Sequence, residues 1–392
     1  MTRWPLLLFL PLTVFAQDDV WDDDAWEEDW DEEQQGIIWS GFVEAGLGTR
    51  FSEDELIDTR NTLEEVRWRF ETEWQPGNVT VGLKADVDYD GIESDWDADV
   101  RDLSAGFTLG DNIDVKIGRQ VQTWGTGDLV FLNDLFPKDF VSFFAGRDDE
   151  YLKAPGNAIR VTRFSPLVNV DFVWTPIFES DVYLTGDRFS FYSPLAGMQV
   201  APRPPFSAEE PEKSFSNGEF ALRLFRTVES TEFAFYAYRG FSKQPPFVAM
   251  NAYGASIRRP AGPGLLNAET SYYTSQGDND QLRFLVGYEW EARPNFSVGL
   301  QYYLESTSDE DRHLLTNRLT YRAGRDKHTF SLFTFYSPSD NDYYLRPVYT
   351  YRHSDQWSLA FGANLFGGNE PDTFFNQLDD ASNAYARVRF HY

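Results

Sequence analysis

The feature that most constrains the fold is a regular alternation of apolar and polar residues, which runs through all but the first tenth of the chain. Val66, Trp68 and Phe70, for example, alternate with Arg67 and Arg69. Successive side chains of a β-strand point to opposite faces, so each run has one apolar face and one charged face. The runs are about 9 to 12 residues long, the length that a tilted strand needs to cross an outer membrane. The pattern therefore predicts membrane-spanning β-strands.

Counting these runs gives eighteen predicted strands. They span residues 37–51, 63–75, 79–89, 98–109, 112–124, 157–164, 168–175, 218–227, 231–240, 251–259, 264–274, 281–291, 295–305, 313–323, 327–337, 342–353, 356–366 and 382–392. Pro347 removes one backbone donor from the ladder of its strand. An even number of strands is typical of bacterial outer-membrane barrels.

The connections between the predicted strands alternate in length. The short ones carry Gly, Pro, Asn and Asp, as in 75–78, 260–263 and 292–295. Most of those between them are longer, including 125–156, 176–217 and 367–381. Short turns on one side and longer loops on the other are also typical of outer-membrane barrels. We therefore predict an all-β fold, a transmembrane antiparallel up-and-down β-barrel of about 18 strands, outer-membrane type.

Composition excludes several classes of function. The chain has no cysteine, which excludes disulfides, thiolate metal sites and cysteine nucleophiles. Its formal charge of -29 makes nucleic acid an unsuitable partner, because phosphate binding needs an excess of cations. The four histidines lie apart, and neither a Gly-x-Ser-x-Gly nor a His-Glu-x-x-His motif occurs. We expect no enzymatic activity, no cofactor and no metal.

The first 36 residues differ from the rest. Residues 1–16 have the basic start, the short apolar stretch and the small residues of a signal peptide, with cleavage expected after Ala16. We predict that residues 17–36 are a disordered acidic tail. The stretch from Asp18 to Glu33 contains 11 acidic residues, and Trp21, Trp26 and Trp30 lie between them. This tail is either a docking peptide for a periplasmic partner or a solvating leader. Residues 37–392 form the predicted barrel.

The C-terminal strand carries a second export signal. Val388, Phe390 and Tyr392 alternate with Arg387 and Arg389, and the chain stops on an aromatic residue. Strands of this kind resemble the signal read by the barrel assembly machinery of the outer membrane. Together with the signal peptide, this strand predicts the outer membrane of a Gram-negative bacterium as the location.

One long connection, residues 125–156, is unusually aromatic for an exposed loop. We expect it to fold into the lumen as a constriction. The residues that would form this constriction are Trp124, Asp128, Phe131, Asn133, Asp134, Phe136 and Arg147. The alternative is a loop that caps the mouth of the barrel or binds lipopolysaccharide.

A short stretch beside this loop carries a family resemblance. Gly118-Arg119-Gln120 ends a predicted strand and leads into Trp124-Gly125. This arrangement resembles an uncharacterised family of porin-like outer-membrane proteins related to alginate-export β-barrels. The resemblance is local, and it implies an eighteen-stranded channel without implying alginate as the solute. Some members of that family resemble partners of inner-membrane lipid exporters, which would give the acidic tail a binding partner.

Charged residues on the inward phase of the strands suggest a pore. The candidate pore-lining residues are Arg318, Arg322, Arg346, Arg352, Arg387 and Arg389 on the last five strands, and Glu71, Glu73, Asp86 and Asp88 on the second and third. They would create a transverse field that selects and orients polar solutes. Alternatively, they form cross-strand ion pairs that stiffen the wall.

Two functions remain open on these observations. The first is a porin-like channel that passes small polar or anionic solutes. The second is the outer-membrane component of a lipid or hydrophobic-compound export system, working with periplasmic and inner-membrane partners. An apolar lumen or a lateral opening would favour the second. In either case we expect contacts with outer-membrane lipid and lipopolysaccharide.

Overall fold

The computed structural model describes residues 37–276 and 280–392. The predicted signal peptide and acidic tail lie outside these residues. The barrel strands are β1 (Ile38–Arg50), β2 (Asn61–Trp74), β3 (Val79–Asp90), β4 (Asp95–Leu109), β5 (Ile113–Val121), β6 (Pro155–Arg163), β7 (Asn169–Thr175), β10 (Glu219–Val228), β11 (Thr231–Phe241), β12 (Ala249–Ala261), β13 (Gly264–Ser275), β14 (Gln281–Arg293), β15 (Phe296–Ser306), β16 (Asp311–Ala323), β17 (His328–Ser337), β18 (Asp342–Arg352), β19 (Trp357–Gly367) and β20 (Asn383–His391).

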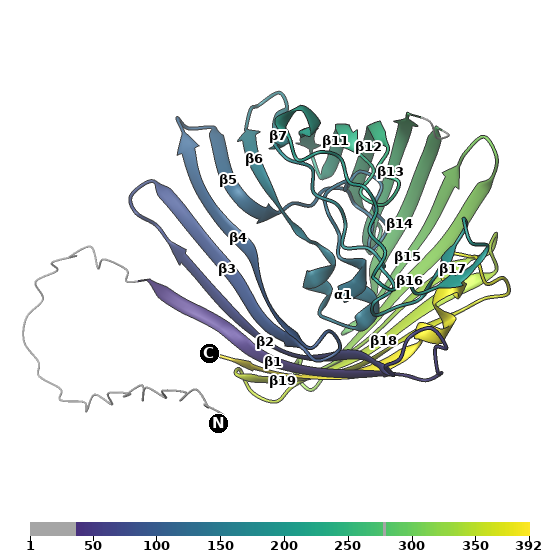
Figure 1. The fold of residues 1–392 in the computed structure, drawn as a ribbon. Helices are drawn as coiled ribbons and strands as arrows, with labels where there is room; N and C mark the ends of the chain where they lie inside the picture. The colour runs from purple at the N-terminus through teal and green to yellow at the C-terminus, as the bar shows by residue number, and fades with distance from the viewer. Residues whose placement is uncertain (1–36, 277–279) are drawn as a thin grey trace, which may run out of the picture. The chain divides into compact units, whose positions relative to one another are not determined.

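All eighteen predicted strands are present, and they form one antiparallel sheet (Figure 1). Each strand pairs with the next along the chain, and β10 pairs with β7 across the longest loop. The last strand then pairs with the first, from Phe42 opposite His391 to Arg50 opposite Asn383. The sheet is therefore closed and has no free edge, which is the condition for β-structure in a membrane.

The alternation of the sequence matches the two faces of this wall. Val66 and Trp68 are 49% and 51% exposed, whereas Arg67 and Arg69 are 4% and 1% exposed. The apolar phase points outward and the ionic phase points into the lumen, which is the reverse of a soluble fold. None of the described residues forms a helix long and apolar enough to cross a membrane.

The connections alternate between the two ends of the barrel. One end carries the short turns, and both Ile38 and His391 lie there because β1 begins and β20 ends at it. The other end carries the long loops; we call these the short-turn end and the long-loop end. Between Leu345 opposite Leu365 and Val348 opposite Gly362 the ladder from β18 to β19 is interrupted but keeps its register, as expected from the missing donor of Pro347.

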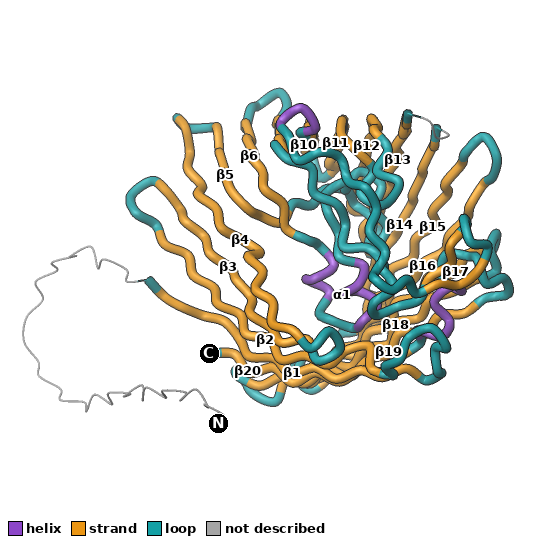
Figure 2. Tube along the Cα trace, in the orientation of Figure 1, coloured by secondary structure: helices purple, strands orange, loops and turns teal. Residues whose placement is uncertain are grey.

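Three long loops contain the remaining elements. Residues 122–154 join β5 to β6 and contain α1 (Phe140–Ala145) and the 3₁₀ turn η1 (Asp149–Leu152). Residues 176–218 contain the hairpin of β8 (Phe191–Ser193) and β9 (Met198–Val200) and the turn η2 (Phe215–Asn217). The loop between β19 and β20 contains the turn η3 (Asn376–Ala381). Figure 2 shows α1 and its flanking loop inside the ring of strands.

Candidate channel and its constriction

The loop of residues 122–154, which we call the inward loop, is anchored on the far wall by Glu269 of β13. Glu269 is 2% exposed and accepts hydrogen bonds from Thr126 N at 2.7 Å, Asn133 N at 3.0 Å and Asn133 Nδ2 at 2.8 Å. The loop also presses against β12, because a Cβ on Gly254 would lie 1.8 Å from the Asn133 side-chain oxygen. A single buried carboxylate thus fixes both ends of residues 126–133.

A second contact continues this anchor along β15 and β16. Asp128 accepts from Nε and Nη2 of Arg318 at 2.5 and 2.8 Å. The backbone of Asp128 exchanges two hydrogen bonds with the Gln301 side chain, at 2.7 and 2.8 Å. Tyr273 of β13 also donates to the Leu132 carbonyl. The two parallel hydrogen bonds from the Arg318 guanidinium to the Asp128 carboxylate fix the orientation of the loop as well as its position.

The inward loop then reaches the opposite wall at β2 and β3. Arg69 donates to Asp86 at 2.6 and 2.7 Å, to Glu150 at 2.6 Å and to the Tyr151 hydroxyl at 2.6 Å. Tyr151 in turn donates to Asp86 at 3.0 Å. Arg147 pairs with Glu65 at 2.7 Å. Burial favours the neutral phenol, so the pKa of Tyr151 is raised and its hydroxyl remains a donor.

Asp148 and Asp149, which precede Glu150 in the inward loop, complete this second attachment. Asp148 lies 3.3 Å from Arg387 and 3.4 Å from Arg389, and Glu44 of β1 binds the same two arginines. Asp149 pairs with Arg346 at 2.9 Å. Burial alone would raise the pKa of Asp148, but the two arginines outweigh it and hold that pKa below its usual value. The carboxylate is therefore charged at neutral pH, and it links the loop to β20.

Aromatic side chains fill the space around α1. Phe143 and Phe144 pack edge-on against Tyr344 of β18, both with ring centroids 5.8 Å apart. Asn364 and Asn383 both donate to the Phe144 carbonyl, at 2.9 and 3.2 Å. This carbonyl is thus satisfied by the wall and not by the helix. The helix is held in the lumen by packing and by hydrogen bonds.

The start of the loop is fixed separately. Trp124 packs edge-on against Phe136 with centroids 5.0 Å apart, and its indole nitrogen donates to Asp171 of β7 at 3.2 Å. Asp134 pairs with Lys138 four residues later at 3.0 Å. Lys138 Nζ also lies 4.7 Å from the centre of the Phe131 ring. Each of the seven residues of the predicted constriction therefore contacts the wall or another residue of the loop.

The candidate pore-lining arginines fall into two groups. Arg346 and Arg387 are buried, Arg389 is largely covered, and all three bind carboxylates of the loop or wall. Arg322 and Arg352 are exposed, and within the described part of the chain their side chains make no hydrogen bond or ion pair. Arg318 binds the loop residue Asp128 and belongs with the first group.

The candidate acidic residues divide in the same way. Asp86 and Asp88 are buried beside Arg67, at 3.3 and 3.1 Å. Glu71 pairs with Lys84 at 3.2 Å, while Glu73 is exposed near the short-turn end. Much of the predicted lumenal charge is therefore used in ion pairs, and the exposed remainder lies towards the short-turn end.

Several residues of this arrangement were not predicted. They are Glu269, Gln301, Glu44, Asn364, Asn383 and Tyr151. Glu269 and Gln301 occupy inward phases of predicted strands, so the alternation predicts that their side chains face the lumen. The loop residues that they bind could not be predicted, because the sequence of the inward loop has no periodic pattern that would indicate its path.

A cavity of about 540 Å³ lies between the inward loop and the wall towards the long-loop end. Its lining is rich in aromatic rings, including Phe131, Phe140 and Phe143 of the loop and Tyr303 and Phe335 of the wall. Cationic side chains also line it, namely Lys138, Lys243, Arg283 and Arg312, each paired with a carboxylate. The cavity therefore offers apolar faces beside fixed charges.

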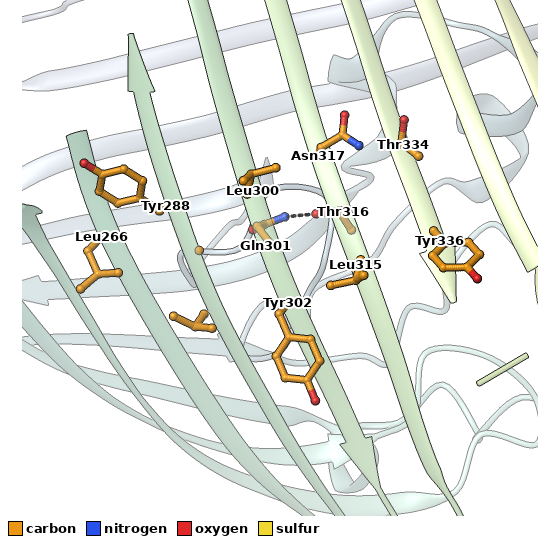
Figure 3. Close-up of a pocket in the computed structure, with 12 residues that line it drawn as sticks. Leu266, Tyr288, Leu300, Gln301, Tyr302, Leu315, Thr316, Asn317, Thr334 and Tyr336 are labelled. Atoms are coloured by element: carbon orange, nitrogen blue, oxygen red, sulfur yellow. Dashed lines mark hydrogen bonds between the residues drawn. The ribbon is translucent and has the colours of Figure 1, made fainter. Parts of the chain in front are cut away.

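A second hollow lies on the outer wall and faces away from the lumen (Figure 3). Leu300, Tyr302 and Leu315 line it, while Gln301 on the opposite face of β15 donates to Thr316 at 2.8 Å. Leu300 and Leu315 are 48% and 46% exposed. Because these side chains belong to the outward apolar phase, the hollow lies outside the lumen.

The described residues hold no group of three or more His, Cys, Asp or Glu side chains placed to bind a metal ion.

No protein-family model matches the chain, and no curated protein sequence matches it either. Among solved structures, OccAB3 of Acinetobacter baumannii superposes with a TM-score of 0.57 at 11% identity, over 90% of this chain and 98% of that one. OccAB4 of the same organism gives 0.55 at 11% identity, over 92% and 99%. The fold is that of an outer-membrane β-barrel. This confirms the predicted fold class, and the identity is too low to show more than the fold.

Removing the Glu269 anchor tests whether the loop is held as described. In Glu269→Ala, the buried amide of Asn133 and the amide of Thr126 lose their acceptor, and each such loss costs about 1 to 3 kcal/mol. We expect the folded barrel to unfold at lower temperature in a heat-modifiability gel. Glu289→Ala is the matched control, since Glu289 is exposed on the inward phase of β14 and the described residues give it no partner. Equal effects of the two substitutions would contradict the anchor.

Proposed function

We propose that the protein is a porin-like channel of the Gram-negative outer membrane that passes small polar or anionic solutes. One observation above all supports this proposal. The inward loop crosses a closed barrel and is attached on both sides, to Glu269 and Arg318 at one wall and to Arg69 and Arg387 at the other. A barrel of this width cannot be filled by wall side chains alone, so such a loop defines the narrowest part of a passage.

The charges around the passage support a polar or anionic solute. Arg322 and Arg352 are exposed near the short-turn end without an acidic partner among the described residues. Unpaired fixed charge raises the local concentration of counter-ions and so favours anions. The carboxylates nearest to the constriction, Glu269 and Asp128, are occupied by loop donors and by Arg318.

The aromatic cavity supports the second candidate, export of a lipid or hydrophobic compound with periplasmic and inner-membrane partners. Its rings could accommodate an apolar group while a neighbouring arginine binds a charged one. The resemblance to alginate-export barrels, the signal peptide, the assembly signal and the contact with lipopolysaccharide stay predictions alongside either candidate.

Recording from planar bilayers separates the two candidates. We expect discrete channels whose reversal potential in a salt gradient indicates a preference for anions, because the exposed lumenal arginines attract them. Small carboxylates added to one side should carry current. A barrel that passes no ions but binds a long-chain fatty acid would instead favour the export candidate.

A further inference from the structure

A small hollow lies in the lumen on the short-turn side of the inward loop. It measures about 60 Å³, and Thr126 and Asp128 of the loop line it together with residues of β12 to β17. A water molecule needs roughly 10 to 15 Å³ of such space. The hollow can therefore hold a few water molecules or one small polar solute.

Arg258 of β12 and Glu289 of β14 bring opposite charges to this hollow. Both side chains are exposed, and within residues 37–276 and 280–392 neither makes a hydrogen bond or an ion pair. Glu232, which lies opposite Arg258 on β11, is already paired with Arg223 at 2.8 Å. Arg258 and Glu289 are thus both available to a solute.

The other two charged residues of the hollow neutralise each other. Asp128 of the inward loop accepts two hydrogen bonds from Arg318 of β16, at 2.5 and 2.8 Å. A fork of this kind occupies the charge of both partners. Among the described residues that line the hollow, one cation and one anion therefore remain unpaired.

The ladder explains why Arg258 and Glu289 do not pair with each other. Arg258 lies opposite Asn267 on β13, and Glu289 lies opposite Leu265 on the same strand. Two strand spacings, about 10 Å, separate the two residues, and they are also offset along the strands. Gly299, opposite Glu289 on β15, has no side chain that could cover the carboxylate. The two charges therefore stand on either side of a gap, and both side chains are long enough to turn towards a solute in it.

We propose that this hollow is a binding site for a small zwitterion, a solute that carries both a carboxylate and an ammonium group, such as an amino acid. The Arg258 guanidinium binds the carboxylate through two parallel hydrogen bonds, and the Glu289 carboxylate binds the ammonium group. A simple anion or cation satisfies only one of these groups and meets a like charge at the other. The inference rests on the proposed channel, because the solute reaches the hollow through the lumen.

Glycine and glycolamide test the site, because they consist of the same atoms but only glycine is a zwitterion. Purified full-length protein in liposomes should admit labelled glycine faster than labelled glycolamide at the same low concentration, after subtraction of entry into protein-free liposomes. Two exposed charge contacts correspond to a preference of about threefold to tenfold.

Neutral substitutions should remove this preference. Glu289→Gln and Arg258→Gln should each abolish it, and the swapped pair Arg258→Glu with Glu289→Arg should restore part of it, since a zwitterion can bind in either direction. The matched controls are Glu291→Gln and Arg259→Gln, which should keep the preference. Glu291 lies two residues further along β14 and does not line the hollow, and Arg259 follows Arg258 on the opposite face of β12. Heat-modifiable migration shows whether each variant is folded.

Equal entry of glycine and glycolamide, or no recovery in the swapped pair, would overturn the proposal. Faster entry of glycine in Glu289→Gln would also overturn it, because the arginine alone would then act and the site would be one for anions. A barrel that admits glycolamide without favouring glycine would refute this inference and leave the proposed channel intact. A barrel that admits neither solute would contradict the proposed channel, and this inference with it.

Discussion

Removing residues 131–144 and closing the gap with a short Gly-Ser linker should raise single-channel conductance severalfold. The deletion takes away five phenylalanines and α1, whose side chains occupy the lumen between β13 and β18. The flanking contacts of Asp128 with Arg318 and of Arg147 with Glu65 remain, so the rest of the loop keeps its attachment to both walls. Current through a pore rises with the cross-section at its narrowest point, and we propose that this segment defines that point.

A control deletion separates this effect from general loosening of the loops. Residues 194–197 form the exposed tip of the β8–β9 hairpin, where Leu195 is fully exposed. Removing them should leave the conductance unchanged. If the deletion of 131–144 also left it unchanged in a folded channel, the passage would run elsewhere, and the loop would act as a cap or a lipopolysaccharide contact.

The fold could be predicted from the sequence because one physical constraint acts at every position of the wall. Lipid outside and water or polar groups inside require alternation, and the strand length is set by the bilayer. The strand ends differ by a few residues where pairing continues into a loop, as at Asn61 and at Ala261, which pairs with Gly264. Those extensions depend on the partner strand and not on the alternation.

The site was less predictable because its contacts join elements of different kinds. Alternation assigns Arg346, Arg387 and Arg389 to the inward face. It cannot show that Asp148 and Asp149, two neighbours in a loop, bind arginines of β18 and β20. The loop follows the side chains that attract it, and its sequence alone does not show which wall it meets.

The double substitution Arg387→Glu and Arg389→Glu should prevent formation of a stable barrel. Glu44 is 2% exposed, and both arginines bind it together with Asp148. The substitution would place four carboxylates around one buried site. Breaking a buried ion pair costs about 3 to 5 kcal/mol, and like charges add to that cost. Heat-modifiable migration should be lost, and adding Glu44→Gln should restore part of it.

Arg322→Glu with Arg352→Glu is the matched control for this substitution, because these two arginines lie on inward phases and are exposed. This control should fold normally. Its reversal potential should move towards cation preference, because the fixed charge near the mouth changes sign. We therefore propose that the six candidate arginines serve two purposes, attachment of the loop and selection of the solute. If the variant at 387 and 389 gave a folded channel with a shifted reversal potential, those arginines would line the passage, and the loop would depend on its other attachments.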